Sequence, residues 1–304
     1  MDPRHRSRIV TDGGDAARRR TAGPGPLRSY TGRAAVLATK HDKLPLVAPP
    51  LAAVGLEVLA VAVDTDRLGT FTGDVARSGS AWDTAVAKAR LGMHAARCSI
   101  GIATEGSIGP HPSAPFVNSA IELVVLVDDE LGIVIGETEA GFDIIVVSAD
   151  ITAHDNVDEL LRRGQFPAHA MTVRPAAGAV QPIFKGIRTR HELGQAIREC
   201  ATASSNARAR VETDLRAHQC PTRRPIIARA AERLAARLAS CCPECNTPGW
   251  GIVRLEFGLP CGHCGRDVPI ARADVWGCAM CPATRIVDRA QAVADPARCD
   301  WCNP

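Results

Sequence analysis

The sequence predicts an α/β protein whose mixed central sheet is flanked by helices and followed by a small C-terminal zinc-ribbon module. Between residues 33 and 240, apolar runs typical of buried strands alternate with segments of helical periodicity. Beyond residue 240, cysteines gather in pairs at a spacing typical of metal sites. We therefore divide the chain into a basic tail expected to be disordered (1–30), an α/β domain (31–240) and a double zinc-ribbon module (241–304).

Composition excludes several classes of function. The chain has 304 residues, of which 46% are hydrophobic and 23% charged, as in soluble globular proteins. Only 4% are aromatic and the net charge is +3, which argues against nucleic-acid partners. No stretch is long and apolar enough for a membrane span, and residues 1–30, with seven arginines, lack the apolar run of a secretory signal. These features predict a cytoplasmic protein without a membrane partner.

The α/β domain begins with two patterns of buried strands, at residues 33–39 and 56–63. The segment between them is expected to be helical or irregular and to be broken at Pro49 and Pro50, because proline lacks an amide hydrogen and clashes with the preceding turn. A third strand is expected at residues 99–104.

Helix and turn signals divide the rest of the domain. Ser80 is expected to cap a helix over residues 80–96, with Asp83 completing a variant of the capping box. Residues 120–138 have the strongest hairpin pattern, with Gly132 able to take a positive φ in the turn. Further helices are expected at 155–164, 190–201 and 222–240, and further strands at 169–175 and 181–187. In the last helix Arg229, Arg233 and Arg237 recur every fourth residue, which predicts a solvated face.

Eight of the twelve cysteines form four C-x-x-C pairs, separated by gaps of 15, 13 and 17 residues. A two-residue spacer lets both thiolates of a pair point at one ion, and two pairs complete a tetrahedral four-sulfur site, which suits zinc better than an iron–sulfur cluster. We expect two structural zinc ions. Joining the pairs in sequence is the simplest arrangement, and a cross-braced arrangement would use the same ligands. These ligands are Cys242, Cys245, Cys261, Cys264, Cys278, Cys281, Cys299 and Cys302.

Three segments have the side chains that a phosphate-and-metal site needs. The first follows the first strand, where backbone amides and basic side chains can bind anions. The second is the helix over 80–96, and the third follows the third strand, where a carboxylate suits magnesium or water activation and two glycines allow tight turns near a ligand. The candidates are Thr39, Lys40, His41 and Lys43 in the first segment, Asp83 and Lys88 in the second, and Glu105 and Ser107 in the third.

The order of these segments resembles the inosine-triphosphate pyrophosphatase superfamily, the house-cleaning enzymes for non-standard nucleotides. Thr39 and Lys43 match its phosphate loop, and Glu105 matches its acidic strand end. In this chain the loop is one residue short before Lys43, and His41 stands where the family has Asn. In the helix, Asp83 stands in place of the family's Glu, Thr84 stands in place of its Asn, and Lys88 matches its Lys. The family also has a nucleotide-contacting segment before the final helix, and the similar segment here would offer Arg216, His218 and Arg223. The whole chain also resembles an uncharacterised bacterial family that joins such a domain to a Cys-rich ribbon.

The resemblance implies an enzyme that hydrolyses a nucleoside triphosphate, or a related phosphoanhydride, to monophosphate and pyrophosphate. Asp83 and Glu105 would hold magnesium and activate water, while Lys43 and Lys88 would clamp phosphate oxygens. Arg216 would help to hold the far end of the substrate. The alternative is a binding or adaptor protein, which would hold a nucleotide or phosphorylated ligand without turnover and engage a protein partner through the zinc ribbons. A zinc-stabilised scaffold is the third hypothesis.

Overall fold

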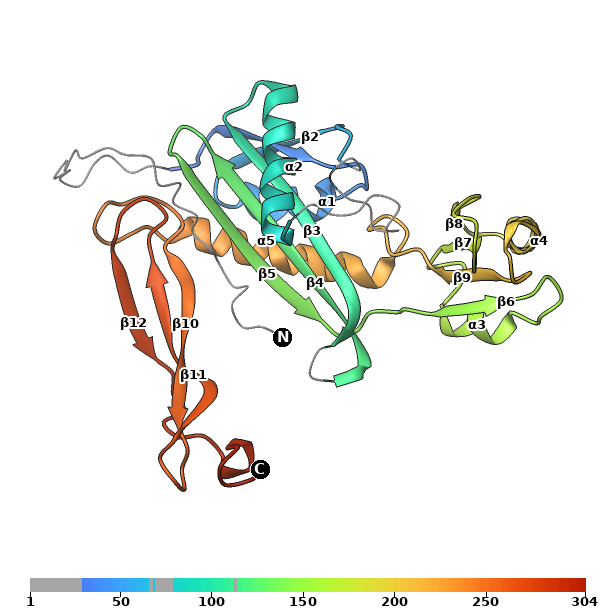
Figure 1. Cartoon of the computed structure of the whole chain (residues 1–304). Helices are drawn as coiled ribbons and strands as arrows, with labels where there is room; N and C mark the ends of the chain where they lie inside the picture. The colour runs from blue at the N-terminus through green and yellow to red at the C-terminus, as the bar shows by residue number, and fades with distance from the viewer. Residues whose placement is uncertain (1–28, 66–67, 69–78, 112–113) are drawn as a thin grey trace.

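Three β-sheets organise the part of the chain that the computed structural model describes, which is residues 29–65, 68, 79–111 and 114–304 (Figure 1). Of the basic tail expected at 1–30, residues 1–28 lie outside the described part of the chain. Tyr30, the last residue of that range, is only 2% exposed and packs into the main core.

The first sheet is mixed, as the sequence predicts, and has the strand order β2-β1-β3-β4-β5. Strand β1 pairs in parallel with β2 and β3, whereas β4 pairs antiparallel with β3 and β5. The carboxyl ends of the three parallel strands therefore meet at one edge of the sheet. The strands are β1 (Arg33–Ala38), β2 (Leu56–Val61), β3 (Ile100–His111), β4 (Ala114–Asp128) and β5 (Ile133–Gly141).

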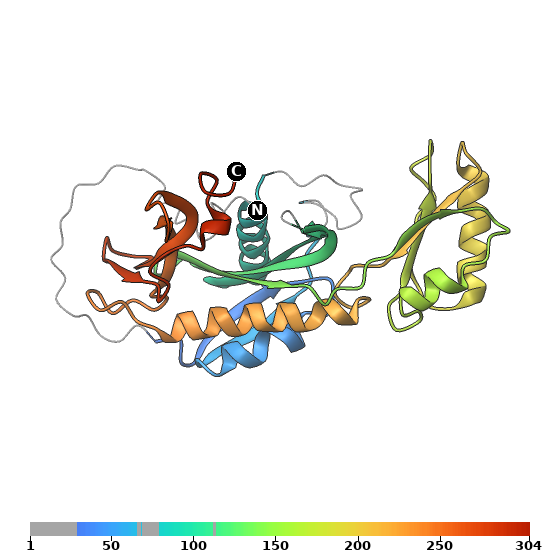
Figure 2. The same cartoon turned by 90° about the horizontal axis from the view of Figure 1, so that it is seen from below.

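Helices cover both faces of this sheet (Figure 2). Helices α1 (Leu44–Ala52) and α5 (Arg224–Ala239) enclose the larger core on one face, and α2 (Ala81–Ala96) packs on the other. The capping box of α2 is confirmed, because Ser80 accepts a hydrogen bond from the Asp83 amide and Asp83 accepts one from the Ser80 amide. The turn between β4 and β5 has Gly132 at a φ of 66°, as expected.

A second sheet, of order β6-β9-β7-β8, is inserted between β5 and α5. It forms a small lobe with its own core, built on residues such as Val173, Leu193 and Val211 (Figure 1). The sequence patterns did not predict a sheet separate from the first one. The elements of the small lobe are β6 (Ser148–Ile151), α3 (Asp158–Arg163), β7 (Met171–Pro175), β8 (Phe184–Ile187), α4 (Arg190–Ala203) and β9 (Ala209–Thr213).

The third sheet belongs to the cysteine-rich module and has the order β10-β11-β12, all antiparallel. Its strands are β10 (Gly251–Pro260), β11 (Asp267–Gly277) and β12 (Thr284–Asp288). Strand β10 begins shortly after the first C-x-x-C pair and ends next to the second, and β11 returns from the second pair to the third. The long strands therefore separate the cysteine pairs into two groups at opposite ends of the hairpin.

Two local expectations are wrong. Helix α1 runs through Pro49 and Pro50, because Val47 and Leu51 are fully buried in the core and this packing outweighs the lost backbone hydrogen bonds. Strand β3 does not end before Glu105 but continues to His111. No helix of the described residues is long and apolar enough to cross a membrane.

Gly106 lies inside β3 because a buried ion pair passes over it. A Cβ atom there would lie 2.3 Å from Nη2 of Arg223 and 2.7 Å from the carboxylate of Glu122, whereas a Cβ at Gly109 would meet nothing within 4 Å. We expect Gly106→Ala to lower the free energy of unfolding by about 2 kcal/mol, and Gly109→Ala to change it by less than about 0.5 kcal/mol. Urea denaturation of both variants measures this, and equal losses would contradict the steric explanation.

Candidate metal centres and a buried charge cluster

The eight paired cysteines form two groups of four. One group joins the first and third pairs, and the other joins the second and fourth pairs. The cross-braced arrangement is therefore present, and the simpler expectation of sequential pairing is wrong because β10 carries the second pair away from the first. We call Cys242, Cys245, Cys278 and Cys281 the proximal group, and Cys261, Cys264, Cys299 and Cys302 the distal group.

The sulfur positions fit a tetrahedral metal ion. In the proximal group Sγ of Cys242 lies 3.7 Å from Sγ of Cys281, and in the distal group Sγ of Cys264 lies 3.7 Å from Sγ of Cys299. Four sulfurs at about 2.3 Å from one zinc ion are about 3.8 Å apart. The backbone amide of Met280 donates to Sγ of Cys278 at 3.2 Å, as expected for a thiolate ligand. Cys241 and His263, which the sequence analysis left out of the ligand set, are not in either group.

Arg237 fastens the proximal group to the α/β domain. Its side chain is 6% exposed and donates to the carbonyl oxygens of Gly249 and Gly136 and to the carboxylate of Glu137. Gly249 also lies against Ile135 of β5, where a Cβ would come within 2.1 Å. The expectation that Arg237 lies on a solvated face is wrong, because the cysteine-rich module covers it.

A second cluster, which we call the Lys43 cluster, is buried at the edge where the parallel strands end. The Lys43 side chain leaves the N-cap of α1 and donates a hydrogen bond to Oγ1 of Thr104. Burial and the nearby Arg223 charge lower the pKa of Lys43 to about 8, although the carboxylates of Glu122 and Glu105 oppose this shift. Among the described residues, Lys43 forms no ion pair with a carboxylate.

The other charges of the Lys43 cluster are paired. Lys88 donates to Oε2 of Glu105 at 2.7 Å, and both side chains are almost buried. Arg223 is 2% exposed and Glu122 is fully buried, and their side chains form a two-point ion pair. Among the residues that the structure describes, the cluster therefore holds three cations and two carboxylates.

Further candidates lie where the small lobe joins the main sheet. His41 stacks on His218, with ring centroids 5.0 Å apart. Burial and the neighbouring charge of Arg216 lower the pKa of His218. Arg216 itself is held by Asp214, at 2.6 Å between Nη2 and Oδ2.

Four candidates lie outside the Lys43 cluster. Asp83 accepts from the Ser80 hydroxyl at 2.6 Å in the helix cap, and Lys40 donates to Asp64 at 2.6 Å. Ser107 is exposed on β3, and Thr39 accepts from the backbone amide of His41 at 3.3 Å.

Sequence reasoning missed two residues that hold these side chains in place. Glu122 pairs with Arg223, and the signal that could have revealed it is a lone acidic residue within the otherwise apolar run of β4. Asp214 is 2% exposed, accepts from the Gly186 amide and holds Arg216. Its role depends on the fold of the inserted lobe, which the sequence patterns did not predict.

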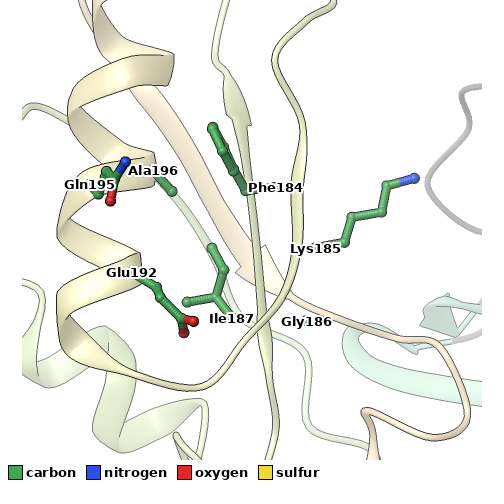
Figure 3. A pocket seen from close by; sticks show the side chains of 7 residues that line it. All are labelled: Phe184, Lys185, Gly186, Ile187, Glu192, Gln195 and Ala196. Carbon is green, nitrogen blue, oxygen red and sulfur yellow. The ribbon is translucent and has the colours of Figure 1, made fainter.

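The pocket drawn in Figure 3 lies in the small lobe and includes no residue of the two cysteine groups or of the Lys43 cluster. It lies between β8 and α4 and has a volume of about 240 Å³. The side chains of Phe184 and Glu192 line it, while that of Lys185 points away from the helix. None of the candidate residues from the sequence analysis lines this pocket.

Paired cysteine substitutions test the pairing of the metal ligands. We expect Cys242→Ser with Cys278→Ser to remove one of two bound metal ions, because both residues belong to the proximal group. Cys242→Ser with Cys261→Ser should remove both ions, because each group loses one ligand. Native mass spectrometry counts the ions. Sequential pairing would give the opposite pattern, with two ions lost from the first variant and one from the second.

Loss of the proximal metal should also weaken the α/β domain, whereas loss of the distal metal should not. Only the proximal group holds the loop that packs on Ile135 and accepts from Arg237. We expect Cys278→Ser to lower the midpoint of thermal unfolding of the α/β domain by several degrees, which corresponds to a loss of roughly 1–3 kcal/mol in the free energy of unfolding. Cys299→Ser is the matched control and should leave the midpoint of this domain unchanged. Circular dichroism at a helix wavelength reports on this domain, and equal shifts would contradict the separate roles.

Removal of the Lys43 charge should not destabilise the fold. A buried cation without a carboxylate partner among the described residues costs folding free energy, so we expect Lys43→Met to keep or raise the free energy of unfolding at pH 7, by on the order of 1–3 kcal/mol. Chemical denaturation checks this. A purely structural role for Lys43 would instead give a clear loss of stability.

The comparisons with known proteins identify a family but no activity. A family model described as a domain of unknown function, DUF6671, matches residues 88–304, which is well over half of the chain. A search of curated proteins and a search of solved structures gave no match. The match begins within α2 and includes the small lobe and both cysteine groups. The chain belongs to the DUF6671 family of domains of unknown function.

Proposed function

We propose that the α/β domain binds the phosphate chain of a nucleoside triphosphate, or of a related phosphoanhydride, at the Lys43 cluster and hydrolyses it. The observation that carries the proposal is a surplus of buried positive charge among the described residues of this cluster. Lys88 and Arg223 each have a carboxylate partner, whereas Lys43 has none among the described residues. A phosphate oxygen would supply the missing negative charge and offset the cost of burying the ammonium group.

The position of the cluster supports a phosphate ligand. Lys43 follows the loop after β1 and caps the start of α1, next to the carboxyl ends of the parallel strands. Ligands of open α/β sheets bind at this edge. His41 comes from the same loop as Lys43, and its ring stacks on that of His218. His218 and Arg216 come from the segment before α5. These side chains can contact the remainder of a nucleotide.

A second candidate function, binding without turnover, is favoured by the state of the two carboxylates. Glu105 is bonded to Lys88, and Asp83 is bonded to Ser80 in the helix cap. Among the described residues, neither belongs to a group of three metal-ligating side chains. Within the described part of the chain this arrangement does not fit a magnesium site, so the proposal of hydrolysis rests on the family resemblance and contains no step through magnesium.

We propose that zinc occupies both cysteine groups, because four thiolates in tetrahedral positions suit this ion and leave no open position for chemistry. Its role is then structural. Residues 241–304 contain six arginines and seven acidic residues. Each zinc–thiolate site adds two negative charges, so the loaded module is acidic. A partner bound by the module is then a protein rather than a nucleic acid, and the reduced thiolates are consistent with the cytoplasm that the sequence predicts.

Product release by the metal-loaded protein tests the proposed function. We expect pyrophosphate release from one class within a panel of standard and deaminated nucleoside triphosphates. Glu105→Gln should lower the rate at least about 100-fold, because Glu105 is the carboxylate proposed to activate water. Ligand binding, measured by calorimetry, should weaken at least about tenfold in Lys43→Met. Lys185→Met is the matched control, because Lys185 lies in the small lobe and does not belong to the Lys43 cluster.

The two candidate functions give different results in this experiment. Binding that depends on Lys43 without product release would support a binding protein and contradict the enzyme. Neither binding nor release from folded, metal-loaded protein would contradict both.

The affinity for phosphates should depend on pH through Lys43. The free protein carries a charged Lys43 below its pKa of about 8 and loses the charge above it, so the affinity should be constant below pH 8 and fall by roughly tenfold per unit above it. Phosphate groups are already ionised in this range. Calorimetric titrations from pH 7 to about 9.5 measure the effect. In Lys43→Met the slope should disappear, and its persistence would assign the titration to another group.

A further inference from the structure

A cleft separates the α/β domain from the cysteine-rich module beside the proximal group. Its volume is about 320 Å³, and its lining comes from β5, α5 and the first two strands of the module. Figure 1 shows how the end of α5 leads into the module next to β5. The cleft shares no residue with the Lys43 cluster. The lining residues that matter here are Glu137, Arg233, Trp250 and Trp276.

One wall of the cleft belongs to a ladder of alternating charges between α5 and β5. Arg229 is bonded to Glu139 at 3.1 Å, and Arg237 is bonded to Glu137 at 2.9 Å. Arg233 stands between them, 3.8 Å from Glu137 and 3.6 Å from Glu139. The ladder thus holds three guanidinium groups against two carboxylates.

Arg233 is the member of the ladder with donors to spare. Both carboxylates are engaged more closely by its neighbours, and within the described residues no hydrogen bond from Arg233 reaches an acceptor. Its side chain is 48% exposed and borders the cleft. A guanidinium with unused donors beside a cavity is a recognition element for a carboxylate or phosphate group.

The cysteine-rich module contributes two aromatic side chains to the lining of the cleft. Trp250 is 6% exposed and packs on the proximal cysteine group, and Trp276 is half-buried beside it. The sequence has only four tryptophans, and two of them line this cleft. Indole rings offer a large flat surface that favours planar ligands.

We propose that this cleft binds a small ligand that has a flat aromatic ring and one anionic group, no larger than a nucleoside monophosphate. The ring packs against Trp250 and Trp276, and the anion accepts hydrogen bonds from Arg233. The ligand contacts both the α/β domain and the cysteine-rich module and therefore stabilises the packing of the one on the other. This site is additional to the proposed phosphate site and does not depend on it.

Two probes test the proposal and distinguish its two anion chemistries. Adenosine 5′-monophosphate carries a phosphate, and indole-3-acetate carries a carboxylate. Each is titrated into the metal-loaded full chain in a Trp301→Phe, Lys43→Met background, which removes an exposed fluorophore and the lysine of the phosphate site. Binding of adenosine 5′-monophosphate is followed by quenching of tryptophan fluorescence and confirmed by calorimetry, and binding of indole-3-acetate, which is itself an indole fluorophore, is followed by calorimetry alone. We expect at least one probe to bind with a dissociation constant below about 1 mM.

Arg233→Gln should weaken that binding at least about tenfold, and Trp276→Leu should weaken it as well. Arg229→Gln is the matched control, because Arg229 belongs to the same ladder but does not line the cleft. Unchanged affinity in Arg233→Gln, or equal losses in both arginine variants, would overturn the proposal. So would the absence of binding by both probes up to about 10 mM. Failure here leaves product release and Lys43-dependent binding untouched, so the two proposals fail separately.

Discussion

The ion pair between Arg223 and Glu122 is the interaction on which the arrangement of the α/β domain depends. Both side chains are almost fully buried, and such a pair is costly to desolvate, so it fixes geometry more than it adds stability. It ties the start of α5 to β4, and Arg223 also donates to the carbonyl oxygen of Leu215, in the segment that returns from the small lobe. It therefore aligns the lobe with the sheet and requires glycine at position 106. The charge of Arg223 helps to lower the pKa of Lys43, and the carboxylate of Glu122 opposes this shift.

Features with local causes could be predicted from the sequence. The capping box at Ser80, the turn at Gly132 and the spacing within each C-x-x-C pair involve residues a few positions apart, so their side chains meet whatever the rest of the fold does. Lys43 and Glu105 come after or near the ends of parallel strands and therefore lie at one edge of the sheet. The contact of Lys88 with Glu105 comes from helix α2 and does not follow from the order of the strands.

Features that depend on distant contacts could not be predicted in this way. Which cysteine pairs share a metal is decided by the antiparallel pairing of β10 with β11. Helix α1 tolerates two prolines only because Leu51 and its neighbours fill the main core. The partner of Arg223 lies 101 positions earlier in the chain, so Arg223 could be interpreted only as a ligand-binding residue. The separate sheet of the small lobe has the same cause, since β6 pairs with β9 across α3, α4 and two strands.

The extended form of β10 has a consequence for how the chain acquires its metals during synthesis. The first two cysteine pairs emerge from the ribosome before the third and can bind one ion together while the chain between them is unfolded. Ten residues of strand hold these pairs roughly 30 Å apart, which makes that misligated state incompatible with the finished hairpin. The finished hairpin is therefore compatible only with sharing of a metal between the first and third pairs and between the second and fourth pairs, so an ion bound early by the first two pairs must be released before β10 pairs with β11.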